Sequence, residues 1–114
     1  MKILAEDLRA FAKERQWEKF HSPKNLSMAL SVEASEIVEL FQWMTEEESR
    51  TLSDEKLKML KEEIGDVMIY LLNLSDKFAI DPIESAKEKF EINKKKYPVH
   101  KVKGRADKYT EYKD

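Results

Sequence analysis

The sequence of 114 residues contains no cysteine, which excludes disulfide bonds, thiolate zinc sites, iron–sulfur clusters and cysteine nucleophiles. Glycine occurs twice and proline three times, so the turn residues that many all-β folds and glycine-rich phosphate loops require are scarce. The longest apolar run, residues 67–72, is far shorter than the roughly 20 residues of a membrane span. Acidic residues at positions 6 and 7 are unlike a signal peptide. We therefore expect a cytoplasmic protein with no membrane contact.

An excess of charge of one sign is also lacking, because the sequence has 21 Lys and Arg residues and 23 Asp and Glu residues. A protein that binds a nucleic-acid polymer is expected to carry a basic excess, so this partner is not predicted. The charges are unevenly placed: residues 31–66 hold 11 acids and 4 bases, whereas residues 94–114 hold 8 bases and 3 acids. An acidic site facing a basic one suits a metal-bound phosphate. The alternative is a pair of oppositely charged surfaces that serve solubility or self-association.

Apolar periodicity and capping signals predict four helices in a single domain of residues 1–114. Ser22 and Ser53 are the expected N-caps of the second and third helices. Prolines are expected at the first positions of the second and fourth helices, residues 23 and 82. An acidic connection is expected at residues 45–49, and a surface tail at residues 98–114. These elements indicate an all-α four-helix bundle. The predicted helices cover about residues 3–17, 23–43, 54–78 and 82–96.

Four carboxylates stand in unusual places on the second and third predicted helices. Glu33 falls in the middle of an apolar helix face, and Glu36 lies one turn later on its flank. Glu63 and Asp66 repeat the three-residue spacing at the edge of the next apolar face. If the two helices pack antiparallel, all four carboxylates converge and repel one another. Such repulsion is usually neutralised by a bound hard divalent cation such as Mg²⁺, Mn²⁺ or Ca²⁺.

Two other interpretations of these carboxylates remain open at this point. Each could form a salt bridge with a nearby Lys or Arg. A di-iron bundle would need Glu-x-x-His motifs, and neither His21 nor His100 stands in that relation to a glutamate. The di-iron interpretation is therefore weak, and the choice lies between a divalent cation site and salt bridges.

Five segments resemble the MazG-like all-α nucleotide pyrophosphohydrolases, in particular their small single-domain branch, which includes the dCTP pyrophosphatases. The metal-type motifs are SVEASEIVELFQW at residues 31–43 and EEIGDV at residues 62–67. The flanking motifs are FHSPKNL at 20–26, INKKKYP at 92–98 and GRADKYT at 104–110. Because these motifs extend from position 20 to position 110, the resemblance covers nearly the whole chain.

The resemblance implies an Mg²⁺-dependent enzyme, with Mn²⁺ as a substitute, that clears unwanted nucleotides from the cell. Its substrate would be a (deoxy)nucleoside triphosphate, dCTP-like, cleaved between the α and β phosphates to the monophosphate and pyrophosphate. The metal ligands and catalytic residues implied are Glu33, Glu36, Glu63 and Asp66. One of these carboxylates, for example Glu36, would orient or deprotonate the attacking water.

The resemblance also implies a set of substrate-binding residues and a homo-oligomer, dimer or tetramer, in which sites are completed across subunits. Wide apolar arcs on the second and third helices favour such assembly independently. Each of these implications has an alternative. The aromatic residues could be core or interface residues, and the lysines could form a solvated basic stripe. The protein could be a non-catalytic bundle that binds a nucleotide or a partner. The residues implied are Trp17, His21 and Trp43 for the base, Tyr70, Lys89 and Asn93 for phosphate or sugar, and more weakly Lys96.

Overall fold

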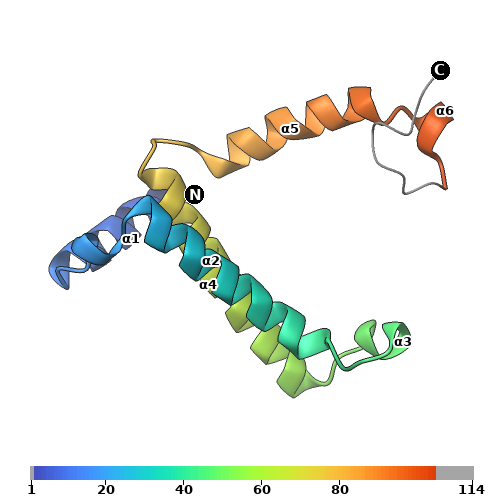
Figure 1. Cartoon of the computed structure of the whole chain (residues 1–114), viewed down its shortest axis with the longest axis horizontal. Coiled ribbons are helices and arrows are strands. Elements are labelled where there is room, and N and C mark those ends of the chain that lie inside the picture. Colours follow the sequence, from blue (N-terminus) through green and yellow to red (C-terminus); the bar gives the residue numbers. More distant parts are fainter. Residues whose placement is uncertain (1, 105–114) are drawn as a thin grey trace. The chain divides into compact units, whose positions relative to one another are not determined.

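The computed structural model describes residues 2–104, and every regular element in this range is helical, which confirms the all-α prediction (Figure 1). The chain divides into two compact units, residues 1–81 and residues 82–114. No helix among the described residues is both long and apolar enough to cross a membrane. The elements are α1 (Lys2–Glu14), the 3₁₀ turn η1 (Glu18–Phe20), α2 (Pro23–Phe41), α3 (Glu46–Ser49), α4 (Asp54–Asp76), α5 (Pro82–Lys96) and α6 (Val99–Val102).

Both predicted serine caps are confirmed, and they fix where the two long helices begin. The hydroxyl of Ser22 accepts a hydrogen bond from the backbone N–H of Asn25 at 3.1 Å, and Pro23 follows as the first residue of α2. The hydroxyl of Ser53 accepts one from the backbone N–H of Lys56 at 3.2 Å at the start of α4. Each cap satisfies one backbone donor that the first helical turn leaves unpaired.

The predicted ends of three helices are wrong by two or three residues. The first helix ends at residue 14 instead of 17, the second at 41 instead of 43, and the third at 76 instead of 78. Gln16 and Ala79 lie just past two of these ends in the left-handed region, with φ of 54° and 53°. A left-handed residue stops an α-helix, and side-chain periodicity carries no signal for it. The predicted helix over residues 82–96 is confirmed in full as α5.

The acidic connection contains a regular element that the prediction lacked. Residues 46–49 form the single turn α3, closed by a capping box in which Thr45 and Glu48 bond each other's backbone N–H groups at 3.1 and 2.9 Å. The Thr-x-x-Glu signature of this box is present in the sequence. The predicted tail likewise begins with a helical turn, α6, whereas its residues 105–114 lie outside the described part of the chain.

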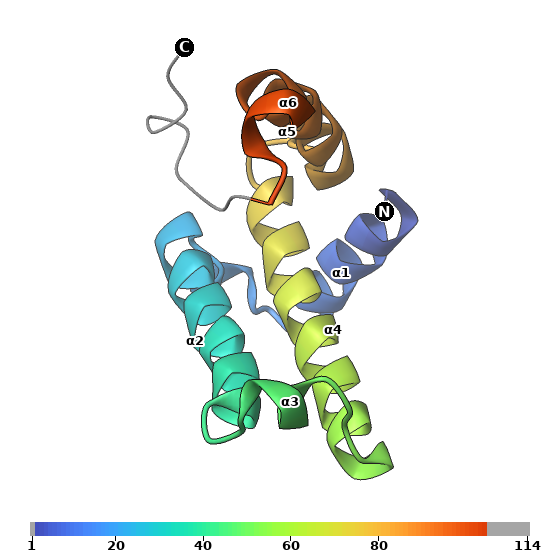
Figure 2. The same ribbon diagram turned by 90° about the vertical axis from the view of Figure 1, so that its right-hand side faces the viewer.

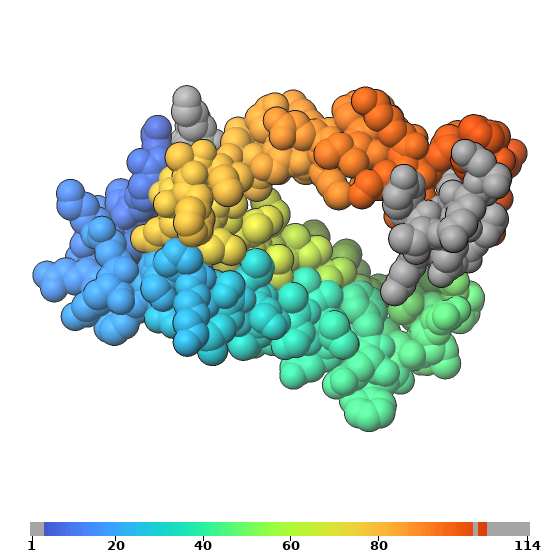
Figure 3. Space-filling model, turned by 45° about the horizontal axis from the view of Figure 1, so that its top comes forward, coloured from blue at the N-terminus to red at the C-terminus, as the bar shows by residue number. Residues whose placement is uncertain are grey.

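The first unit is built on two long antiparallel helices, α2 and α4, which lie side by side over most of their lengths (Figures 2 and 3). The shorter α1 packs on the C-terminal part of α4 and reaches it through an ion pair between Arg9 Nε and Asp76 Oδ2 at 2.9 Å. This arrangement confirms the antiparallel packing on which the predicted carboxylate cluster depended.

The core of this unit is small for its apolar content. Many large apolar side chains remain more than one third exposed, among them Val32 and Val38 on α2. Exposed apolar area of this extent is typical of a surface that another molecule covers. The buried apolar side chains of the described residues are Ala12, Leu26 and Leu72.

Candidate metal and nucleotide site

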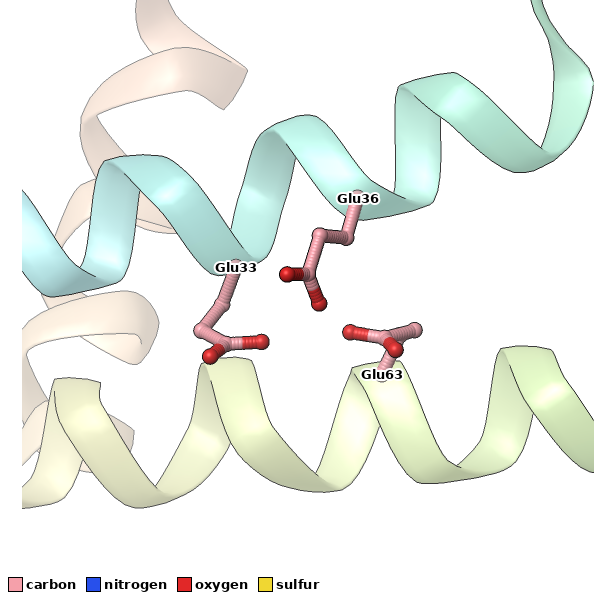
Figure 4. Close-up of side chains that lie close together, drawn as sticks. All are labelled: Glu33, Glu36 and Glu63. Carbon is pink, nitrogen blue, oxygen red and sulfur yellow. The ribbon is translucent and has the colours of Figure 1, made fainter.

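Three of the four predicted carboxylates meet between the two long helices. Glu33 and Glu36 point from α2 towards α4, and Glu63 points back from α4 into the same space (Figure 4). One carboxylate oxygen from each residue lies within 4.8 Å of the other two. The i, i+3 spacing places the two α2 side chains on one side of the helix, and the antiparallel packing supplies the third.

Burial and repulsion from neighbouring carboxylates both disfavour the charged forms of Glu33 and Glu63. Hydrogen bonding to Glu36, burial and the negative charge of Glu36 raise the pKa of Glu63 from 4.5 to about 7. Burial, followed by hydrogen bonding to Glu36 and the charges of Glu36 and Asp66, raises the pKa of Glu33. The cluster therefore behaves as an anionic site short of positive charge.

The salt-bridge alternative finds no support in the described part of the chain. The ion pairs within residues 2–104 involve other carboxylates, and none reaches Glu33, Glu36 or Glu63. The Oε2 atoms of Glu33 and Glu63 are buried without a hydrogen-bond partner. A buried acceptor without a partner costs free energy. A set of oxygen ligands, some of which have no hydrogen-bond partner, fits a hard divalent cation such as Mg²⁺.

A cavity of about 290 Å³ opens where α1 crosses α4. Aromatic and aliphatic side chains form most of its wall, and one edge of Trp17 meets Phe11 with ring centroids 5.6 Å apart at 75°. Tyr70 lies in the wall seven residues beyond Glu63 on α4, about 10.5 Å along the helix axis. The lining residues are Asp7, Leu8, Phe11, Ala12, Trp17, His21, Ile69, Tyr70 and Asn73.

Comparison with known proteins fits this arrangement. The MazG-like family profile matches residues 28–112, a range that includes both carboxylate-bearing segments. The chain belongs to the MazG-like family. It is 41% identical over 112 residues to dCTP pyrophosphatase 1 of Bos taurus and to that of Homo sapiens, with 93% of this chain aligned. The chain spans 66% of the length of these two relatives.

A solved structure of the same kind supports the fold. A crystal structure of a pyrophosphatase from Archaeoglobus fulgidus DSM 4304 is 43% identical and superposes with a TM-score of 0.70. The superposition covers 86% of this chain and 92% of that one. At 43% identity, the likeness extends beyond the fold to the sequence.

The base-binding residues predicted for this MazG-like chain separate into two places. Trp17 and His21 line the cavity together with Tyr70, as expected if they contact one ligand. Trp43 lies two residues past the C-terminus of α2, and 89% of its surface is exposed. Because α2 has 19 residues and is therefore about 28 Å long, Trp43 stands at the opposite end of the helix from the cavity.

The remaining predicted residues are not brought to the three-carboxylate group within one unit. Asp66 is exposed and stands outside the group, although its charge acts on Glu33. Its role as a fourth ligand stays a prediction. Lys89, Asn93 and Lys96 all lie on α5, which belongs to the second unit, so their roles also stay predictions.

Polar residues that were not predicted from the sequence also lie next to the site. Asp7 and Asn73 line the aromatic cavity. Lys56 lines a cavity of about 370 Å³ at the other end of the cluster, which it shares with Glu36 and Glu63. A signal existed for Asn73, because it follows Tyr70 by three residues on the same face of α4. None existed for Asp7, whose place depends on how α1 crosses α4.

The raised pKa of Glu63 predicts an unusual pH dependence of stability in the metal-free protein. Below about pH 4.5 the carboxyl is protonated in both the folded and the unfolded chain, so it has no effect. Between about pH 4.5 and pH 7 the unfolded chain ionises first, so the free energy of unfolding should fall as pH rises. We expect the melting temperature in EDTA to decline through this window, and saturating Mg²⁺ to reverse the decline.

Thermal melts followed by circular dichroism, with and without EDTA, test this expectation. Glu63→Gln should flatten the pH profile in EDTA, because glutamine does not titrate. Glu62→Gln is the matched control, since Glu62 is exposed, stands outside the cluster and should leave the profile unchanged. A melting temperature in EDTA that stays constant or rises between about pH 4.5 and pH 7 would contradict the prediction.

Proposed function

We propose that the chain is a metal-dependent nucleoside triphosphate pyrophosphohydrolase that converts a (d)NTP, dCTP-like, to the monophosphate and pyrophosphate. The observation that carries this proposal is the convergence of Glu33, Glu36 and Glu63 beside an aromatic cavity in the same unit. The names of the relatives, dCTP pyrophosphatase and pyrophosphatase, point to the same chemistry. The axial distance of about 10.5 Å between Tyr70 and Glu63 leaves room for a nucleoside at one end and phosphates at the other.

Glu33, Glu36 and Glu63 would hold Mg²⁺ in this mechanism, with Asp66 as the proposed fourth ligand. When bound, the cation supplies neutralisation of phosphate charge and activation of a water molecule. Glu36 lies on the flank of the apolar face, and we assign it the role of orienting that water and accepting its proton. The α–β anhydride bond breaks, and its bridging oxygen leaves with pyrophosphate.

Positive charge and hydrogen-bond donors for the phosphates would come from α5 and α4. Lys89 and Asn93 lie four residues apart, so they share one face of α5, and Lys96 follows three residues later. Tyr70 lines the aromatic cavity seven residues beyond Glu63 on α4, and its hydroxyl would contact the sugar or first phosphate. These groups would position the chain of phosphates while the carboxylates serve the reacting bond.

The base would stack against aromatic side chains in the cavity, as proposed for Trp17, with His21 at its edge. Trp43 cannot reach this cavity in its own chain, because the length of α2 lies between them. We propose that the working form is a homo-oligomer, dimer or tetramer, in which Trp43 completes the cavity of a neighbouring copy. The exposed apolar side chains of α2 would form part of that interface.

Product analysis over a panel of dNTPs with Mg²⁺ tests the activity itself. We expect one equivalent of monophosphate and one of pyrophosphate from at least one dNTP. Malachite green should therefore detect phosphate only after inorganic pyrophosphatase is added. Direct release of orthophosphate with a nucleoside diphosphate would contradict the proposal, because that product means cleavage at the γ-phosphate. EDTA supplies the negative control.

A further inference from the structure

The aromatic cavity carries polar side chains that stacking does not require. A base stacked on Trp17 would be held through its flat faces, and stacking of this kind tolerates every base. Choice among bases needs hydrogen bonds to the edge of the ring. Besides His21, which the proposed function places at the edge of the base, Asp7 and Asn73 carry polar groups suited to an edge, and they come from different helices, α1 and α4.

Asp7 and Asn73 are both available to a ligand. Within residues 2–104 neither side chain takes part in an ion pair or a hydrogen bond, whereas Arg9 and Asp76, on the far side of Asn73, satisfy each other at 2.9 Å. Asn73 is half-buried, and an amide in that position gains from a partner. The cavity therefore offers one acceptor-only group and one amide that can both donate and accept.

We propose that Asp7 and Asn73 read the edge of the base, so that the site selects a base with an exocyclic amine beside a ring-nitrogen acceptor. This inference rests on the proposed function and names the base class that the same site accepts. Cytosine presents this pattern through N4 and N3, and adenine presents it through N6 and N1. Asp7 accepts a hydrogen bond from the amine, and the Asn73 amide donates one to the ring nitrogen.

The two residues differ in what they can discriminate. Uracil and thymine reverse the pattern, since they place a carbonyl oxygen where cytosine has its amine and an N–H where cytosine has N3. The side-chain amide of Asn73 can flip, so that its oxygen accepts a hydrogen bond from that N–H. Asp7 cannot adapt, because an ionised carboxylate only accepts and would face the carbonyl oxygen of uracil. Asp7 thus discriminates between the two kinds of base, whereas Asn73 contributes to the binding of both.

Equilibrium binding of nucleoside monophosphates tests this assignment without turnover, since these products have no anhydride bond to cleave. Calorimetric titrations with dCMP, dUMP and dAMP in the presence of Mg²⁺ should give an amine-bearing nucleotide about tenfold or more tighter binding than dUMP. Asp7→Asn should bring the ratio close to one or invert it, because asparagine can donate to the uracil oxygen. Asn73→Ala should weaken dCMP and dUMP by similar factors and keep the ratio.

Glu6→Gln is the matched control, because Glu6 is the neighbouring exposed acid on α1 and does not line the cavity. It should leave all three dissociation constants unchanged, and melting curves should verify that every variant is folded. A wild-type protein without preference for the amine, or a ratio that survives Asp7→Asn, would overturn the assignment. Tighter binding of dAMP than of dCMP would uphold it and identify adenine as the source of the amine. Pyrophosphate release from any dNTP would still uphold the proposed function in each case.

Discussion

Replacing Glu33 with glutamine is expected to lower turnover of the accepted dNTP at least about a hundredfold, since loss of an outer-shell partner of a metal ligand alone costs 10–100-fold. The same change should leave the melting temperature in EDTA unchanged or higher. Glu33 lies beside Glu36 on α2 and faces Glu63 on α4, and removal of one charge relieves their repulsion when no metal is present.

The opposite effects on turnover and stability separate a metal site from a structural role. Steady-state kinetics with Mg²⁺ and thermal melts in EDTA measure the two quantities on the same preparations. Glu62→Gln again serves as the control, because it removes a neighbouring charge outside the cluster and should alter neither quantity. A Glu33→Gln protein that melts well below wild type in EDTA would instead identify Glu33 as a structural anchor.

Mixing two impaired chains is expected to restore activity if subunits share sites. Under the proposed function, Asp66→Asn would damage the metal end of a site, and Trp43→Ala would remove the aromatic contact that a neighbour contributes. In a two-fold dimer that contains one chain of each kind, one site receives both damaged residues and the other receives neither. Random reassembly of equal amounts should therefore recover roughly a quarter of wild-type turnover.

A second mixture controls for non-specific rescue. Asp66→Asn with Glu33→Gln places both lesions in the metal half of a site, so every reassembled site stays damaged and activity should not return. Light scattering at micromolar concentration provides the physical counterpart, since an oligomer must exceed the chain mass of 13.5 kDa. A monomer, or no recovery in the first mixture despite demonstrated subunit exchange, would count against shared sites.

The helices and their beginnings could be predicted from the sequence because the signals are local. The Ser22 and Ser53 caps act within three residues, and the i, i+3 carboxylate pairs lie on single helices. The Thr45–Glu48 capping box was equally local, and its signature predicts the turn that the sequence analysis missed. Helix ends were harder, because the left-handed backbone at Ala79 has no counterpart in apolar periodicity.

The cavity could be predicted only in part, because it depends on how helices cross. Trp17 and Tyr70 were identified from motifs, yet their common place in one wall follows from the packing of α1 on α4. Asp7 is an ordinary exposed helix residue until that packing is known. The separation of Trp43 from Trp17, by contrast, follows from the length of α2 alone, at about 1.5 Å per residue.

The position of the carboxylate cluster in the middle of the α2–α4 hairpin has a consequence for how such a protein can change over generations. The three clustered carboxylates occupy the central stretch of α2 and α4, whereas the walls of the aromatic cavity come largely from α1, the η1 region and one end of α4. Asn73 lies ten residues beyond Glu63 on α4, or nearly three helical turns, so substitutions at Leu8 or Asn73 can reshape the cavity at a distance from the carboxylates. Under the proposed function, chemistry and selectivity lie in separate parts of the chain, so a lineage could shift its preferred nucleotide while its hydrolytic residues stay the same.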